Sequence, residues 1–192
     1  MRTLLCSLAL LALITGCATV DKPPLKTVPH VDLPRYMGDW YVIGEIPYFA
    51  EKDCVDSIES YALREDGDID NWFTCRKKTF DAPMKRILTT TAKIKDKTTN
   101  AEWRVKFFKV LSIKYLIVDL DPNYQWVAVA HPSRNYGWIM ARSKTLSEST
   151  YQAILGRLGE QGYDTSRFQK VPQNTQAGDS AAAGHPEAAH KQ

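Results

Sequence analysis

Eight short segments that combine apolar and β-branched residues follow one another through the middle of the chain. Turn residues separate most of them, and strand-like segments without helices between them favour an antiparallel meander over a parallel sheet. Eight such strands can close into an up-and-down barrel that leaves no free edge. The predicted strands cover residues 40–46, 55–63, 69–75, 84–94, 102–108, 113–120, 125–130 and 136–142.

The pattern changes after the eighth segment. Residues 146–148 are typical of a helix start, and Gly162 is typical of a helix end. Apolar residues recur between them on one helical face: Tyr151, Ile154, Leu155 and Leu158. Residues 168–171 are expected to form a short strand that pairs with the barrel. The sequence therefore predicts an all-β fold, an eight-stranded antiparallel up-and-down β-barrel with one C-terminal α-helix packed outside and a short ninth strand.

Residues 1–17 have the features of an export signal. Arg2 is followed by an apolar run over residues 4–14 that is too short to span a bilayer comfortably. The run ends in Ile14-Thr15-Gly16-Cys17, which resembles the bacterial lipobox. In such signals the cysteine receives a diacylglycerol, the chain is cut before it, and the new amine is usually acylated, as with palmitate. A secretory signal cut near Ala18 is the alternative.

The lipobox resemblance implies a location on the bacterial outer membrane, lipid-anchored and facing the periplasm, because Ala18 rather than aspartate follows the cysteine. We expect a signal peptide over residues 1–16. Residues 17–32 are expected to form the lipidated Cys17 and a flexible, proline-rich tether. The folded domain is predicted over residues 33–172. Residues 173–192 have the composition of a disordered tail.

Two cysteines remain outside the export signal, Cys54 and Cys75. In an oxidising periplasm we expect two thiols in neighbouring strands to form a disulfide, and two reduced core cysteines are the alternative. No histidine cluster or second pair of cysteines accompanies them, so no metal is expected. The formal net charge of +3 is small, and the basic triplet at residues 76–78 lacks stacking aromatics. No nucleic-acid partner is predicted.

Enzyme motifs are missing from the sequence. It contains neither G-x-S-x-G nor H-E-x-x-H, and His131 is the one histidine that falls inside the predicted domain. The sequence therefore predicts a protein that is not an enzyme and that needs no cofactor. Hydrolysis or isomerisation of a lipid is kept as a lesser alternative.

Three separated motifs resemble those of the lipocalin family, and in particular of bacterial outer-membrane lipocalins related to apolipoprotein D. The first is Gly38-Asp39-Trp40-Tyr41 on the first predicted strand. The second is residues 121–126, Asp-Pro-Asn-Tyr-Gln-Trp, at the turn after the sixth strand. The third is residues 138–142, Trp-Ile-Met-Ala-Arg, on the eighth strand. The resemblance covers nearly all of residues 33–172.

The resemblance implies a closed barrel floor in which Arg142 packs against Trp40, with Gly38 at the start of the same strand. A guanidinium over an indole face gains about 0.5–2 kcal/mol of cation–π attraction. This role is structural. A surface arginine and an ordinary core tryptophan are the alternative.

Strand alternation and the resemblance together nominate the residues of a ligand pocket. Every second strand residue faces inward, so Trp138 and Met140 share a face with Arg142 but lie higher in the barrel. The resemblance implies that Trp138 contributes to the pocket. The ligand-binding candidates are Trp138, Tyr115, Met140, Ile117, Phe108 and Val42. For each of them, a filled core position that never meets a ligand is the alternative.

The implied function is the binding of fatty acids or lysophospholipids in the barrel, for storage or transport in the cell envelope. The implied partners are these lipids and the outer membrane, which the protein contacts through its N-terminal lipid. A homodimer is compatible with the sequence. The alternative of another class is a structural envelope lipoprotein that binds a protein partner without a lipid. A barrel filled by its own side chains would favour that alternative.

Overall fold

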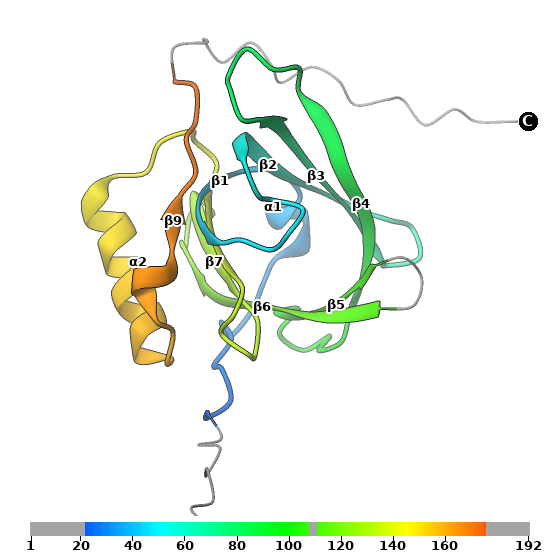
Figure 1. The fold of residues 1–192 in the computed structure, drawn as a ribbon. Helices are drawn as coiled ribbons and strands as arrows, with labels where there is room; N and C mark the ends of the chain where they lie inside the picture. Colours follow the sequence, from blue (N-terminus) through cyan, green and yellow to red (C-terminus); the bar gives the residue numbers. More distant parts are fainter. Residues whose placement is uncertain (1–21, 108–110, 176–192) are drawn as a thin grey trace, which may run out of the picture.

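The computed structural model describes residues 22–107 and 111–175. Its strands form one antiparallel sheet in the order β2-β3-β4-β5-β6-β7-β8-β1-β9, and the additional pairing of β1 with β2 closes eight of them into a barrel (Figure 1). The predicted fold class is confirmed. The strands are β1 (Gly38–Ile46), β2 (Cys54–Leu63), β3 (Ile69–Lys77), β4 (Lys85–Ile94), β5 (Glu102–Phe107), β6 (Leu111–Leu120), β7 (Trp126–Ala130), β8 (Gly137–Ala141) and β9 (Gln169–Lys170).

Strand β1 joins the two edges of the sheet. Its first residues pair with β2, from Gly38 opposite Tyr61 onward, and its later residues pair with β8. The register against β8 shifts between Val42 and Gly44, which marks a β-bulge. Because the bulge inserts one residue, the side chains after it exchange faces. Trp40 and Val42 face the interior before the bulge, and Glu45, paired with Trp138, faces it afterwards.

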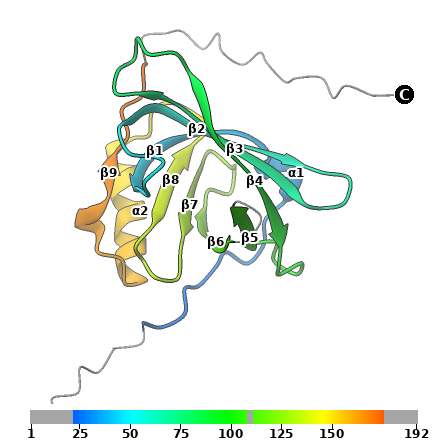
Figure 2. The same cartoon turned by 45° about the vertical axis from the view of Figure 1, so that its right-hand side comes forward.

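Two apolar clusters lie on opposite faces of the barrel wall. The interior cluster contains Trp40, Phe73, Trp103, Ile117 and Met140, all of them buried. The outer cluster lies between the wall and helix α2 (Glu148–Glu160), which runs outside the barrel alongside β9 (Figures 1 and 2). The helix contributes its predicted apolar face there: Tyr151, Ile154 and Leu158 are buried, and Leu155 is partly buried.

A short helix that the sequence did not predict, α1 (Leu33–Tyr36), lies at the entry to β1. Asp32 caps it, and its side chain accepts a hydrogen bond from the Arg35 amide. Four residues give too few apolar repeats for a helical period to be recognised in the sequence. The helix places Tyr36 inside the barrel against Trp40, with 5.2 Å between the ring centroids.

The predicted tether over residues 17–32 needs a correction in its second half. Leu25 packs on the outer cluster, and the Val28 amide donates to the Ile117 carbonyl at 3.0 Å. Val31 is fully buried, and its amide donates to the Thr99 carbonyl at 2.7 Å. Prolines alone favour a flexible segment, but the apolar residues between them anchor this one to the barrel. Cys17 lies outside the described residues.

The predicted tail over residues 173–192 needs a similar correction at its start. The Gln173 side chain donates to the carbonyls of Val42 and Ser57, at 2.8 and 3.2 Å. The Asn174 amide donates to the Asp56 carboxylate at 2.6 Å. These two residues therefore belong to the folded domain. Gln173 meets backbone carbonyls at the bulges in β1 and β2, and Asn174 meets a carboxylate on β2. The residues beyond 175 lie outside the described part of the chain.

Candidate ligand-binding site

The closed end of the barrel is built around Arg142. Its guanidinium carbon lies 3.7 Å from the centre of the Trp40 ring, and the Trp40 indole donates to the Tyr36 carbonyl at 2.8 Å. The same guanidinium donates to four carbonyls at 2.7–3.0 Å, those of Arg35, Tyr36, Met37 and Asp39. Arg142 thus satisfies carbonyls at the C-terminal end of α1, which a helix leaves unpaired.

Gly38 begins β1 with φ of +91°, a conformation that other residues rarely adopt. A Cβ atom at this position would lie 3.5 Å from the Arg142 guanidinium. The arrangement that the lipocalin resemblance implied for Gly38, Trp40 and Arg142 is thus present in the structure.

An apolar cavity of about 220 Å³ lies inside the barrel above this floor. Its wall is mostly apolar and includes Leu88, Val105, Phe107, Ile113, Trp138 and Met140. Small-molecule sites usually measure about 300–1,000 Å³, so this cavity suits a narrow ligand or part of a longer one. Phe49, 82% exposed, and Tyr48 border it from the loop between β1 and β2.

Three of the six predicted pocket residues line this cavity: Trp138, Met140 and Tyr115. Val42 and Ile117 are fully buried in the interior cluster but are not part of the cavity wall. They lie closer to the floor: Val42 is two residues from Trp40, and Ile117 pairs its backbone with Ala101 and Val28. Phe108 lies outside the described residues.

Tyr115 joins a network of hydroxyl groups at the inner end of the cavity. Its hydroxyl lies 2.7 Å from that of Tyr36 and 2.8 Å from that of Tyr61, and its ring stacks on Trp103 at 4.9 Å. Burial raises the pKa of Tyr115 well above its usual value, and the neighbouring tyrosines add to the effect. The network is therefore neutral at physiological pH and offers a ligand hydroxyl groups rather than charge.

Glu59 also lines the cavity, and sequence reasoning missed it. Its carboxylate accepts a hydrogen bond from the Asn71 amide at 2.6 Å. Burial raises the pKa of Glu59 to about 7, and the Asn71 hydrogen bond opposes the shift. Its side chain keeps some accessible surface because it faces the cavity. Its position two residues before Tyr61 on β2 could have identified it, since residues two apart on a strand share a face.

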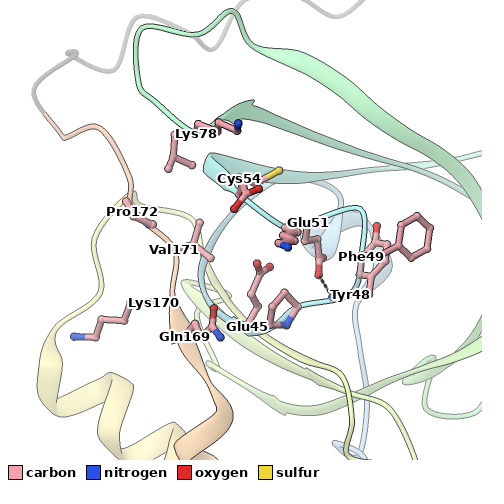
Figure 3. A pocket seen from close by; sticks show the side chains of 14 residues that line it. Glu45, Tyr48, Phe49, Glu51, Cys54, Lys78, Gln169, Lys170, Val171 and Pro172 are labelled. Carbon is pink, nitrogen blue, oxygen red and sulfur yellow. Dashed lines mark hydrogen bonds between the residues drawn. The ribbon is translucent and has the colours of Figure 1, made fainter.

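A second pocket, of about 680 Å³, opens at the mouth of the barrel beside the apolar cavity, and Tyr48 and Phe49 border both (Figure 3). We call it the mouth pocket. The carboxylates of Glu45 and Glu51 point into it. The Glu51 oxygens accept from the Trp138 indole at 2.6 Å and from the Tyr48 amide at 3.0 Å. The Cys54–Cys75 disulfide, with 5.6 Å between its Cα atoms, holds the adjoining start of β2, as predicted.

Burial raises the pKa values of both mouth glutamates. The pKa of Glu45 rises to about 8, and repulsion from Glu59 adds to the effect while Lys77 opposes it. The pKa of Glu51 rises through burial and repulsion from Glu45, against its hydrogen bonds from Tyr48 and Trp138. Neither residue was predicted, because strict alternation from Trp40 points Glu45 outward and Glu51 lies in a loop. Only the bulge in β1 turns Glu45 inward.

The architecture and the arrangement of the floor match a known family. A family model described as a lipocalin-like domain matches residues 31–173. The chain belongs to the lipocalin family. This lipocalin is 31% identical to temperature-induced lipocalin-1 of Arabidopsis thaliana over 163 residues, which cover 80% of this chain and 86% of that protein. It is 28% identical to the outer membrane lipoprotein Blc of Escherichia coli over 162 residues, 84% of this chain and 90% of that protein.

Solved structures share the fold at lower sequence identity. Insecticyanin from the tobacco hornworm Manduca sexta superimposes with a TM-score of 0.61 at 17% identity, covering 78% of this lipocalin and 84% of that chain. The allergen Per a 4 from cockroaches superimposes with a TM-score of 0.57 at 21% identity, covering 80% and 96%. These likenesses concern the fold. The resemblance read from the three sequence motifs is confirmed by the family match.

Proposed function

We propose that this lipocalin binds single-chain lipids, fatty acids or lysophospholipids, in its barrel and stores or carries them in the cell envelope. The observation that carries the proposal is the apolar cavity of about 220 Å³, lined by Trp138, Met140 and Tyr115, above a floor that is fully packed. Lipocalins as a family bind small hydrophobic ligands, which supports the proposal.

Binding of this kind needs no covalent chemistry. Transfer of apolar surface from water into an existing cavity contributes about 25 cal/mol for each Å² buried. The tyrosine hydroxyls at the inner end and the carboxyl of Glu59 add hydrogen-bonding groups that orient a ligand. The open cavity supports a ligand-binding role over a ligand-free structural lipoprotein, in which the same side chains would fill the barrel.

We further propose that a lipid on Cys17 anchors the protein to the outer membrane on its periplasmic side. The relatives that are named outer membrane lipoproteins support this location. Among residues 22–107 and 111–175, no helix is long and apolar enough to cross a membrane. Replacement of Cys17 by alanine is expected to move the protein from the membrane fraction to the soluble fraction, and unchanged fractionation would contradict the anchor.

The start of the described chain favours an anchor near the mouth. The Arg134 guanidinium, in the turn between β7 and β8, donates to the Pro23 carbonyl. That turn lies at the mouth end, because Gly137 at the start of β8 pairs with Ile46 at the end of β1. Pro23 follows Cys17 by six residues, which can span at most about 20 Å. A lipid at Cys17 would therefore hold the mouth close to the membrane that supplies the ligand.

Mass spectrometry of lipids that co-purify with the protein tests the proposed ligand class. We expect single-chain lipids in an amount approaching one per protein. An extract that contains only the two-chain phospholipids of the surrounding membrane, from a protein that also fails to bind added fatty acid, would contradict the proposal.

A further inference from the structure

The mouth pocket contains two acidic side chains that the apolar cavity does not explain. Glu45 is 5% exposed and Glu51 is 1% exposed, and they reach the pocket from β1 and from the loop that follows it. Figure 3 shows both carboxylates directed into the pocket. Carboxylates are rarely buried to this extent unless a partner compensates for the lost water.

The two glutamates differ in how their oxygens are satisfied. Glu51 accepts one hydrogen bond at each oxygen, from Trp138 and from Tyr48. The Oε2 atom of Glu45 is buried and has no hydrogen-bond partner in the described part of the chain. Most buried polar atoms in proteins have a partner, so this oxygen marks a position that a ligand can complete.

The other charged groups around the mouth pocket do not neutralise its two buried carboxyl groups. Lys77 donates to the carbonyls of Ala50 and Lys52, at 2.9 and 2.8 Å, and so is held by the loop. The remaining charges on the pocket wall are exposed, where water and salt screen them: Lys52, Asp53, Lys78 and Lys170. Glu59 faces the adjoining cavity and adds a third carboxyl group nearby.

We propose that Glu45 and Glu51 form a subsite for the ammonium group of a single-chain amphiphile whose apolar chain enters the adjoining cavity. The inference rests on the proposed function and names the ligand class that this lipocalin prefers. An ammonium group that carries N–H can donate a hydrogen bond to the unpaired Glu45 oxygen and brings a positive charge beside both carboxyl groups. The rings of Tyr48 and Phe49, on the same pocket wall, offer faces for cation–π contact.

Trp138 connects the two halves of this site. Its indole N–H donates to Glu51 on the mouth side, while the residue also lines the apolar cavity. Tyr48, which packs edge-on against Trp138 at 6.4 Å between ring centroids, lines both spaces. A ligand can therefore hold its head in the mouth pocket and its chain in the cavity. At pH 8, close to the raised pKa of Glu45 and above that of Glu59, the carboxylate of a fatty acid in the same position would meet negative charge.

Calorimetric titration of the delipidated protein with two twelve-carbon probes, dodecylammonium and dodecanoate, tests the inference. Both probes are kept below their micelle-forming concentrations, at pH 8. We expect the ammonium probe to bind at least tenfold more tightly. Glu45→Gln should weaken ammonium binding about tenfold and leave dodecanoate binding unchanged or tighter. Glu65→Gln, which removes the same charge from the exposed turn between β2 and β3, should change neither.

The outcomes separate the subsite from the proposed function. Dodecanoate binding that equals or exceeds ammonium binding in the unmodified protein would overturn the subsite, and this comparison needs no variant. An ammonium preference that persists in Glu45→Gln would overturn it as well. Failure of both probes to bind would contradict the lipid-binding function itself. A third probe, lysophosphatidylethanolamine, which also carries a primary ammonium, distinguishes the source of that group. Binding as tight as that of dodecylammonium indicates a zwitterionic lipid, and weaker binding indicates a long-chain amine.

Discussion

Arg142 combines two roles that a surface arginine would not have. It covers the Trp40 ring and donates to four carbonyls around the end of α1. We expect Arg142→Ala to lower the free energy of unfolding by about 2–4 kcal/mol, because the buried Trp40 ring loses its cover and four carbonyls, two of them in part-buried hydrogen bonds, lose their donor. Urea unfolding measures the change. Arg64→Ala is the matched control, since Arg64 forms exposed ion pairs with Asp66 and Asp70 that contribute about 1 kcal/mol or less. Equal losses in the two variants would contradict the role of Arg142.

Glu45 makes stability depend on pH in a defined direction. Burial raises its pKa from 4.5 to about 8, so between these values the folded protein holds a proton that the unfolded chain has lost. Stability from this group is fully present below about pH 4.5 and is lost as the pH rises toward about 8. Each unit of pKa difference corresponds to about 1.4 kcal/mol.

The corresponding variant tests that direction. The glutamine in Glu45→Gln cannot lose a proton. The melting temperature of the variant, relative to that of the unmodified protein, should therefore rise between pH 5 and pH 8. The gain is about 2–4 °C for each kcal/mol in a domain of this size. Glu59, whose pKa is about 7, contributes to the remaining pH dependence in both proteins. A constant difference in melting temperature across this range would show that the pKa of Glu45 is not raised.

At the scale of elements, the packing of α2 against β1 depends on Gly44. A Cβ atom there would lie 2.5 Å from the Tyr151 hydroxyl oxygen of α2, which is too close for any contact. We expect Gly44→Ala to destabilise the fold by about 1–3 kcal/mol, measured by urea unfolding. Gly156→Ala provides the control, because a Cβ in this exposed position of α2 would meet nothing within 4 Å. That change should stabilise the protein by about 0.5–1 kcal/mol. A neutral Gly44→Ala would contradict the close packing of helix against barrel.

The elements also show which features the sequence could predict. Strand order and the buried face of α2 follow from local periodicity, and both agree with the structure. The inward turn of Glu45 could not be predicted, because a bulge appears only when two strands pair. The burial of Glu51 depends on the fold of a whole loop and on Trp138, which lies 87 positions away in the chain. The sequence therefore predicts three residues of the cavity wall, and it does not predict the two glutamates of the mouth pocket.

For the whole molecule, the cavity volume limits the length of chain that gains affinity. Each methylene that leaves water contributes about 0.8 kcal/mol, which is about fourfold in affinity. A cavity of about 220 Å³ should fill before a chain of eighteen carbons is buried. We expect affinity for saturated fatty acids of eight to eighteen carbons to rise and then level off within the series. A steady rise through eighteen carbons, measured by competition with a fluorescent probe, would show that the barrel opens further than the structure indicates.

We infer above all that the barrel interior binds a single-chain lipid. Titration of the delipidated protein with a fluorescent fatty acid tests it most directly. We expect saturable binding of one ligand per protein, weakened about tenfold or more in Trp138→Ala, which removes part of the cavity wall. Trp72→Ala, which removes a tryptophan that Arg86 covers at 5.2 Å and that does not line the cavity, should leave binding unchanged. The absence of saturable binding, or equal binding by both variants, would contradict the binding of lipid in the barrel interior.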